Sequence, residues 1–397
     1  MGEAFIVGAV RTPVGTRKGA LAGVHPADLG AHVLAALVER TGVAPETVED
    51  VIMGCVTQVG PQSLDLARTA WLSAGLPEST PGVTIDRQCG SSQQSAHFAA
   101  QAVMAGVQDV VVAAGVEVMS QVPMGASVGD GKFGFPFGPR VASRYEDVGG
   151  LVPQGISAEL IADKWGISRE DLDAFALSSQ ERAARARDEG RFENEIIAVT
   201  GFHRDKESGE VSELGEKVSA DEGIRESTLE SLAKLKPSFK EDGKVTAANS
   251  SQITDGASAS LIMSEQKANE LGLRPRARFH AMSVVGVDPV LMLTGPIPAT
   301  QKVLDKAGLS VDDIDLFEVN EAFASVLLAW EKEIGADMDK VNVNGGAIAL
   351  GHPLGASGTK LLATLLNELE RTGGRWGLQT MCEGGGMANA TILELLA

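Results

Sequence analysis

The first third of the chain alternates short apolar runs with longer segments whose apolar residues recur at helical spacing. The clearest run is Val110–Ala114, a continuous apolar stretch typical of a strand buried on both faces of a sheet. This alternation of strands and helices predicts a layered α/β domain. We expect strands at Ala4–Val10, Val51–Met53, Val83–Ile85 and Val110–Ala114, and helices at Asp28–Arg40, Leu64–Ala74 and from Gly90 onward.

The pattern changes at Ser120 and stays irregular to about Asn249. A Gly- and Pro-rich segment over residues 125–155 is followed by two expected helices, Ser157–Trp165 and Arg169–Gly190, and then by a polar stretch. We interpret the whole segment as an insertion or lid on the first domain. The alternative is an extended surface loop.

Ordered α/β patterning resumes at Ala257–Met263, and the second half then repeats the order of strand, small-residue turn and helix found in the first. This indicates a duplicated domain with little residue identity between its copies. We expect an N-terminal domain over residues 1–119 and 250–272, an inserted domain over 120–249, and a C-terminal domain over 273–397. The second half is expected to contain strands Arg278–Val287, Asp315–Val319, Val341–Val343, Leu378–Cys382 and Ala390–Leu395, and helices Pro298–Ala307, Ala322–Ile334 and Ser357–Glu370.

The composition narrows the classes of function. Acidic residues outnumber basic ones by 53 to 34, giving a formal net charge of −19, and no long basic cluster stands out, so nucleic acid is not an expected partner. Three dispersed cysteines are too few for a disulfide framework or a zinc site and favour a reducing compartment. No secretion signal and no run of 18 apolar residues is present, so we expect a cytoplasmic protein without membrane insertion.

One cysteine lies where a strand pattern gives way to a helix. Cys89 follows the strand ending at Ile85 and precedes the helix start at Gly90, Ser91 and Ser92. The partial positive charge at a helix N-terminus favours thiolate over thiol, so we expect a lowered pKa and a nucleophilic role. The alternative is a small buried residue at a tight turn.

Three further stretches carry chemically active residues among small ones. His352 is bracketed by glycines in residues 344–358, Cys382 begins the sequence CEGGG at a strand end, and Asn320 follows another strand. Fixed backbone around a histidine suits a positioned base, and free N–H groups beyond Cys382 can form an oxyanion hole. A structural histidine and a helix-capping asparagine are the alternatives. Because ligands of α/β sheets bind at the carboxyl ends of strands, we expect these residues to converge with Cys89.

The convergence predicts a nucleophile, its base and a second acid/base group. No Cys-x-x-Cys pair, zinc-binding helix, dinucleotide fingerprint or P-loop competes with this interpretation. At these residues the chain resembles the thiolase family over essentially its whole length. The four motifs occur in the family's order: DRQCGSS with Cys89, NEAFA with Asn320, GHPLGASG with His352 and CEGGG with Cys382.

The resemblance implies a duplicated α-β-α-β-α layered fold with an inserted loop domain, and a homodimer or homotetramer. It implies that Cys89 attacks the keto carbon of a 3-oxoacyl-CoA, that His352 takes the thiol proton, and that Cys382 protonates the leaving enolate and later activates CoA. His352 with a water held by Asn320 would form one oxyanion site. The backbone N–H groups of Cys89 and Gly384 would form the other. No permanently bound cofactor and no metal is implied, since CoA is a co-substrate.

The resemblance also suggests where CoA and the acyl group bind. Ser251 is the candidate for the pantetheine arm and Arg225 for the nucleotide end. The chain differs from the usual family sequence at two positions near the expected acyl pocket. Gln154 lies in the sequence Pro-Gln-Gly where many members have Met-Gly, and Ser92 replaces a usual glycine. We interpret both as signs of a longer or bulkier acyl group.

Three functions remain in competition at this stage. The first is degradative thiolysis of 3-oxoacyl-CoA to acetyl-CoA or propionyl-CoA and a shortened acyl-CoA, in fatty-acid or sterol-type degradation. The runner-up is biosynthetic acetoacetyl-CoA formation, which shares all four motifs because the reaction is reversible. A non-catalytic lipid-binding protein of the same fold is the remote alternative, since it has no need of Cys89, His352 and Cys382 together.

Overall fold

The computed structural model describes residues 2–205 and 208–396. Its strands are β1 Ala4–Arg11, β2 Gly15–Thr16, β3 Asp50–Gly54, β4 Gly82–Ile85, β5 Val110–Val118, β6 Val199–Arg204, β7 Val211–Val218, β8 Thr254–Ser264, β9 Ala277–Gly286, β10 Leu316–Val319, β11 Trp376–Glu383 and β12 Met387–Leu395. Its α-helices are α1 Pro26–Thr41, α2 Leu66–Ser73, α3 Ser91–Met104, α4 Pro139–Arg144, α5 Gln154–Lys164, α6 Arg169–Asp188, α7 Leu229–Ala233, α8 Glu265–Glu270, α9 Pro296–Ala307, α10 Ala324–Ile334, α11 Ala347–Leu350 and α12 Ser357–Thr372.

The main strands follow the order β10-β11-β12-β9-β1-β8-β5-β3-β4, with β2 paired to β8. Strands β3, β4 and β5 are parallel, as are β10 and β11, whereas β8, β9 and β12 run antiparallel to their neighbours. The two halves of the chain meet where β1 pairs with β9 over only two residue pairs. The sheet is therefore mixed, with parallel strands at both ends.

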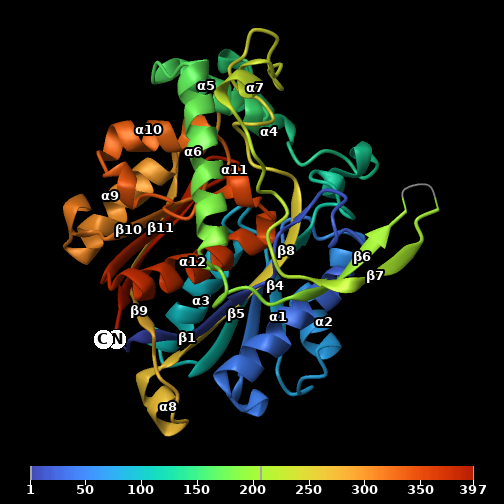
Figure 1. Cartoon of the computed structure of the whole chain (residues 1–397), viewed down its shortest axis with the longest axis vertical. Helices are drawn as coiled ribbons and strands as arrows, with labels where there is room; N and C mark the ends of the chain where they lie inside the picture. The colour runs from blue at the N-terminus through green and yellow to red at the C-terminus, as the bar shows by residue number, and fades with distance from the viewer. Residues whose placement is uncertain (1, 206–207, 397) are drawn as a thin grey trace.

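Helices cover the strands in layers (Figure 1). Helices α1 and α2 pack on the outer side of the first-half strands, and α9 and α10 on the outer side of the second-half strands. Between the two sets of strands, α3 and α12 pack against each other. This order of layers confirms the expected duplicated α-β-α-β-α architecture. The division into three domains at residues 119, 249 and 272 stays a prediction.

Strand β5 shows why an unbroken run of apolar residues predicted a strand buried on both faces. Val110, Val112 and Ala114 face the core beneath α1 and α2, while Val111 and Ala113 face the layer of α3 and α12. Successive side chains of a strand point to opposite faces, so a strand covered on both faces needs an unbroken apolar run.

The segment between β5 and β8 is more ordered than its sequence suggested. Helices α5 and α6 pack against α10 and α11 of the second half through a common apolar core. The polar stretch after α6 contains the hairpin of β6 and β7, which extends from the body of the molecule in Figure 1. Most of β7 is exposed on both faces, so its residues carry no apolar alternation from which a strand could be predicted.

The expected strand at Val341–Val343 is wrong. Val341 makes one isolated bridge to Phe317, and the chain then turns at Asn342, whose φ is +46°. The side-chain amide of Asn342 accepts from the Val319 N–H at 2.8 Å and donates to the Val319 carbonyl at 2.8 Å. A side chain thus replaces the backbone ladder that a strand would have supplied.

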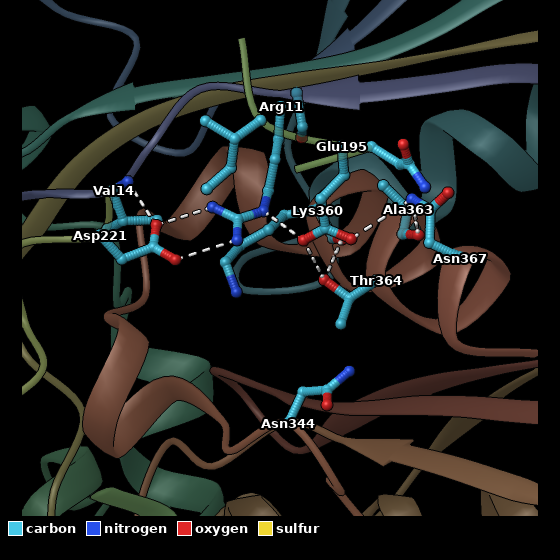
Figure 2. Close-up of polar contacts among 12 residues, drawn as sticks. Arg11, Val14, Glu195, Asp221, Asn344, Lys360, Ala363, Thr364 and Asn367 are labelled. Carbon is cyan, nitrogen blue, oxygen red and sulfur yellow. Dashed lines mark hydrogen bonds and ion pairs between the residues drawn. The ribbon is translucent and has the colours of Figure 1, made fainter. Parts of the chain in front are cut away.

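A buried ionic network joins the first strand, the inserted segment and α12 (Figure 2). Arg11 donates through Nε to Glu195 at 2.6 Å and through both terminal nitrogens to Asp221 at 2.7 and 2.9 Å. Thr364 and Asn367 of α12 donate to the same Glu195 carboxylate. Burial lowers the pKa of Arg11, but the two carboxylates outweigh it and raise the pKa above its ordinary value.

No helix in residues 2–205 and 208–396 combines the length and the apolar character needed to cross a membrane.

Candidate active site

Cys89 lies on the short connection between β4 and α3, as the sequence predicted. Gln88 just before it adopts φ +48°, a conformation that only a tight turn imposes on a non-glycine residue. The turn is fixed by two hydrogen bonds to Ser91, whose hydroxyl accepts from the Arg87 N–H and donates to the Gln88 carbonyl. The thiol is 4% exposed and packs beside Met119.

The expected lowering of the Cys89 pKa is wrong. Burial of the thiol, together with the nearby Glu383 carboxyl, raises the pKa of Cys89 to about 12. Hydrogen bonding from the Gln154 side chain and from the backbone N–H groups of Gly384 and Cys89 acts in the opposite direction. The helix N-terminus was the right feature to notice, but desolvation outweighs it in this enclosed position. In the resting protein Cys89 is a thiol that needs a base.

His352, the expected base, is held in one orientation by Ser357. Its Nδ1 lies 2.5 Å from the Ser357 hydroxyl, which itself donates to the Pro353 carbonyl at 2.8 Å. Since the Ser357 proton is committed to Pro353, Nδ1–H is the donor and Nε2 carries the lone pair. Burial, with a smaller effect of the Lys360 charge, lowers the pKa of His352 to about 3. The imidazole is therefore neutral at physiological pH and able to accept a proton.

Asn320 and Cys382 complete the group. Asn320 follows β10 and places its Nδ2 3.3 Å from His352 Nε2. Cys382 lies in β11, fully buried, and burial together with the charges of Cys89 and Glu383 raises its pKa well above the ordinary value. Asn320 does not cap a helix, because α10 begins only at Ala324.

A cavity of about 720 Å³ opens onto this group. Cys89, His352 and Ser251 line it, together with Ser250 and Phe323. Its wall includes residues of the inserted segment, among them Gln154 and Phe239, as well as residues of both halves of the fold.

Four expected site residues are not part of this wall: Asn320, Gly384, Cys382 and Arg225. Arg225 is exposed and lines a separate polar cavity of about 760 Å³, which Ser231 and Arg187 also line. Cys382 lies behind the wall, in the apolar core shared by Ala322 and Phe323.

Sequence reasoning missed three residues with a place in the site. Ser357 sets the tautomer of His352, and Gln154 lines the cavity with Cys89 and acts to lower the pKa of its thiol. Glu383 is fully buried without a hydrogen-bond partner for either carboxyl oxygen in the described residues. Ser357 was within a motif already singled out, five residues after the histidine. Gln154 was assigned only to the acyl pocket, and Glu383 had no signal beyond its position next to Cys382.

The described residues contain no cluster of three or more His, Cys, Asp or Glu that could hold a metal ion.

Comparison with known proteins identifies the family. Residues 4–266 match the thiolase N-terminal domain model, and residues 273–395 match the thiolase C-terminal domain model. The chain belongs to the thiolase family. Its members include named acyltransferases, and this thiolase is an enzyme of that class.

Two relatives and one solved structure illustrate the similarity. This thiolase is 55% identical over 401 residues to the steroid 3-ketoacyl-CoA thiolase FadA6 of Mycobacterium tuberculosis, covering 100% of this chain and 95% of the relative. It is 45% identical over 406 residues to the 3-ketoacyl-CoA thiolase of Bacillus subtilis, covering 100% of both. The crystal structure of the Bacillus anthracis acetyl-CoA acetyltransferase superposes with a TM-score of 0.89 at 40% identity, covering 100% of this chain and 99% of that one.

Proposed function

We propose that this thiolase cleaves 3-oxoacyl-CoA with CoA, giving acetyl-CoA or propionyl-CoA and a shortened acyl-CoA, through an acyl group carried on Cys89. The observation that supports the proposal most directly is the shared cavity of Cys89 and His352. Beside it, the backbone N–H groups of Gly384 and Cys89 act to lower the pKa of the Cys89 thiol. Two N–H donors at a nucleophile are what an oxyanion site requires.

In the first half-reaction, the Cys89 proton passes to His352 Nε2 and the sulfur attacks the 3-keto carbon. The bond between C2 and C3 then breaks, leaving the shortened acyl group on Cys89 as a thioester. The electron pair of that bond becomes the enolate of acetyl-CoA or propionyl-CoA, which takes a proton from Cys382. His352, with a water held by Asn320, would stabilise the enolate oxygen.

In the second half-reaction, CoA gives its thiol proton to the Cys382 thiolate. The CoA sulfur attacks the acyl carbon on Cys89, and the collapse of the tetrahedral species releases the shortened acyl-CoA. The Cys89 thiolate then recovers its proton from His352. The N–H groups of Cys89 and Gly384 would stabilise the oxyanion of this step.

Burial raises the pKa values of both thiols and lowers that of His352, so in the resting protein both thiols hold their protons and the imidazole is neutral. These shifts oppose transfer of the Cys89 proton to His352. We therefore propose that the transfer accompanies attack on the bound substrate, when the N–H donors stabilise the developing oxyanion.

Two residues are proposed to bind CoA. Ser251 lines the catalytic cavity, and its backbone N–H donates to the Ala322 carbonyl at 2.9 Å, which fixes the turn that would meet the pantetheine arm. Arg225 lines the separate polar cavity and would meet the nucleotide end through its guanidinium.

The proposed direction is degradative, on acyl groups longer or bulkier than acetoacetyl. In support, the relative at 55% identity is named a steroid 3-ketoacyl-CoA thiolase. Gln154, which stands where many members of the family have the Met of a Met-Gly pair, lines the cavity that contains Cys89. A change of side chain at this position would affect the space for the acyl group.

We also propose a homodimer or homotetramer. Strand β4 is the last strand of the sheet, so one of its edges has no strand neighbour in the described chain. Leu64, which lies just before α2, is 91% exposed. An open strand edge beside an exposed apolar side chain suits association with a second copy, and light scattering after gel filtration would measure the mass.

A thiolysis assay across a panel of 3-oxoacyl-CoA substrates tests the function. The wild type is expected to turn over long or branched substrates faster than acetoacetyl-CoA, and Cys89→Ala is expected to abolish turnover of all of them. Cys55→Ala is the matched control, because Cys55 is buried in the core beneath α1 and does not line the cavity. Its activity should stay within about twofold of wild type.

Labelling with iodoacetamide separates catalysis from folding. Cys89 is expected to be alkylated selectively and to be protected by CoA, since it is the cysteine that lines the cavity. Equal, CoA-independent labelling of Cys55, Cys89 and Cys382 would refute the acyl-Cys89 mechanism. Fastest turnover of acetoacetyl-CoA, with none of longer substrates, would instead favour the biosynthetic alternative.

A further inference from the structure

A buried carboxylate near the end of strand β5 binds N–H groups from both halves of the fold. The side chain of Glu117 is fully buried. Its Oε2 accepts from the backbone N–H of Val56 at 2.8 Å and from that of Gly355 at 2.9 Å. Its Oε1 accepts from the Thr57 N–H at 3.1 Å and from the Gln62 side-chain amide at 3.0 Å. Burial raises the pKa of Glu117, and these bonds act in the opposite direction.

The donors to Oε2 come from the two segments that carry the nucleophile and its base. Val56 lies in the connection between β3 and α2, and it packs against the apolar cluster that contains Cys89 and Leu354. Gly355 belongs to the second half of the chain and follows His352 by three residues. A single carboxylate oxygen therefore joins the chain beside the thiol to the chain that carries the imidazole.

Other hydrogen bonds hold the same His352 segment to the first half. The backbone N–H of His352 donates to the Thr254 hydroxyl at 2.9 Å, and the Ser258 hydroxyl donates to the Ala356 carbonyl at 2.6 Å. Both hydroxyls are on β8 and are neutral, whereas Glu117 is a carboxylate surrounded by donors. Hydrogen bonds to a charged acceptor are the stronger kind, so the bond at residue 355 is expected to contribute most.

The backbone of this segment also packs closely on the ends of β3 and β5. A β-carbon at Gly355 would lie 2.7 Å from the carbonyl oxygens of both Gly54 and Val116. A β-carbon at Gly54 would in turn lie 2.8 Å from the Gly355 carbonyl oxygen. Close packing of this kind transmits a displacement to its neighbours instead of absorbing it.

We propose that Glu117 is a positioning residue for the proton transfer between Cys89 and His352. Its carboxylate fixes the separation between the segment beside the thiol and the segment that holds the base. The proposal deepens the function proposed above and rests on it. Glu117 does not line the catalytic cavity, so it acts through the two segments and not on the substrate. A misplacement of about 1 Å at a reacting group can lower a rate by about 10²-fold.

Glu117→Gln tests the proposal, because the amide keeps the size of the side chain but places an NH₂ group opposite N–H donors. Gln62→Leu is the matched control. It removes a donor to the same carboxylate and also leaves the buried Val118 N–H, which Gln62 accepts at 2.8 Å, without its partner. It does not touch the segment of His352.

Both substitutions are made in the wild type and in His352→Asn. For each protein, kcat and KM for thiolysis are measured with the 3-oxoacyl-CoA that the wild type cleaves fastest. The assay temperature is set below the onset of thermal unfolding of every variant.

In the wild-type background, Glu117→Gln is expected to lower kcat at least about tenfold, with KM changed by about threefold or less. In the His352→Asn background the same substitution should change kcat by about twofold or less, because no base is left to be positioned. Gln62→Leu should change kcat by about twofold or less in both backgrounds. A role in stability alone would lower kcat by the same factor with and without His352.

Equal factors for Glu117→Gln in the two backgrounds overturn the proposal, and so does a loss in Gln62→Leu as large as that in Glu117→Gln. If Glu117→Gln does not fold, Glu117→Asp decides by the same comparison, since it keeps the charge but withdraws it by one methylene group. Wild-type enzyme without thiolysis, or full activity of Cys89→Ala, would instead overturn the proposed function and this inference with it.

Discussion

Two buried polar regions of this thiolase differ in how completely their polar atoms are satisfied. In the Arg11 network every guanidinium nitrogen has a hydrogen-bond acceptor, and Asp221 also accepts from the Val14 N–H at 2.8 Å. Near Cys89 and Cys382, both carboxyl oxygens of Glu383 and the Nε of Arg87 are buried without a hydrogen-bond partner in the described residues.

The two regions differ in role because they differ in how fully their polar groups are paired. A fully paired buried network fixes one arrangement of the segments that carry it, here β1, the inserted segment and α12. Buried groups left incompletely paired have strongly displaced pKa values and respond to small changes around them, as acid/base chemistry requires. Helix α12 connects the two regions, since Ser357 holds His352 and Thr364 holds Glu195.

The largest effect is expected from removing the base. His352→Asn should lower kcat/KM for thiolysis by about 10²- to 10⁴-fold, because general base catalysis and one oxyanion donor are lost together. Its free energy of unfolding should change little. His280→Asn is the control, since His280 is half-buried beside Trp376 and absent from the cavity. Activity of His352→Asn within about tenfold of wild type would contradict the assignment.

Breaking the Arg11 network should act on stability rather than on chemistry. Asp221→Asn removes a charge partner of buried Arg11 and should cost about 3 to 5 kcal/mol in a urea unfolding experiment. Burial raises the pKa of Asp221, but Arg11 outweighs it and lowers it below the ordinary value. The stabilisation is therefore present above the unfolded pKa and is lost as the pH falls through the folded one.

The control for this variant is Asp339→Asn, because Asp339 is 97% exposed and its pair with Arg182 spans 4.0 Å. A surface pair of this kind should contribute less than about 1 kcal/mol. Equal destabilisation by the two substitutions would remove the distinction between the network and an ordinary ion pair.

The last expected effect is at Glu383, where the change in stability grows gradually with pH. Burial raises the pKa of Glu383 to about 8, against the attraction of Arg87. The folded state therefore holds a proton that the unfolded state has released, and wild-type stability falls as the pH rises toward 8. Glu383→Gln cannot ionise and should gain relative to wild type over this range, by up to about 1.4 kcal/mol per pH unit.

Unfolding free energies from pH 5 to 9 measure this gain, with Glu210→Gln as the control because Glu210 is exposed. A difference between Glu383→Gln and wild type that does not change with pH would show that the carboxyl keeps an ordinary pKa.

Much of the fold could be predicted because helices cover both faces of the central strands, so these strands need apolar residues at every position. Unbroken apolar runs such as Val110–Ala114 mark the central strands, and helical spacing marks α1, α3 and α12. The prediction failed where no apolar run accompanies the hydrogen bonds. The Asn342 side chain, and not a neighbouring strand, bonds the backbone of Val319. Strand β7 lies on a hairpin whose residues are mostly exposed. Neither leaves an apolar pattern in the sequence.

The sequence by itself determined which chemical groups this thiolase possesses, and for three of them the strand near whose end they lie: Cys89 after β4, Asn320 after β10 and Cys382 near the end of β11. His352 was identified by its glycines, but it follows α11 and not a strand. Such groups can be identified locally because each sits among small residues at a turn. Only the tertiary structure decided their electrostatic state. Desolvation depends on everything packed around a group, so burial reversed the expected shift at Cys89 and kept His352 neutral. The contact of Gln154 with Cys89 likewise exists only because the inserted segment folds back over the cavity.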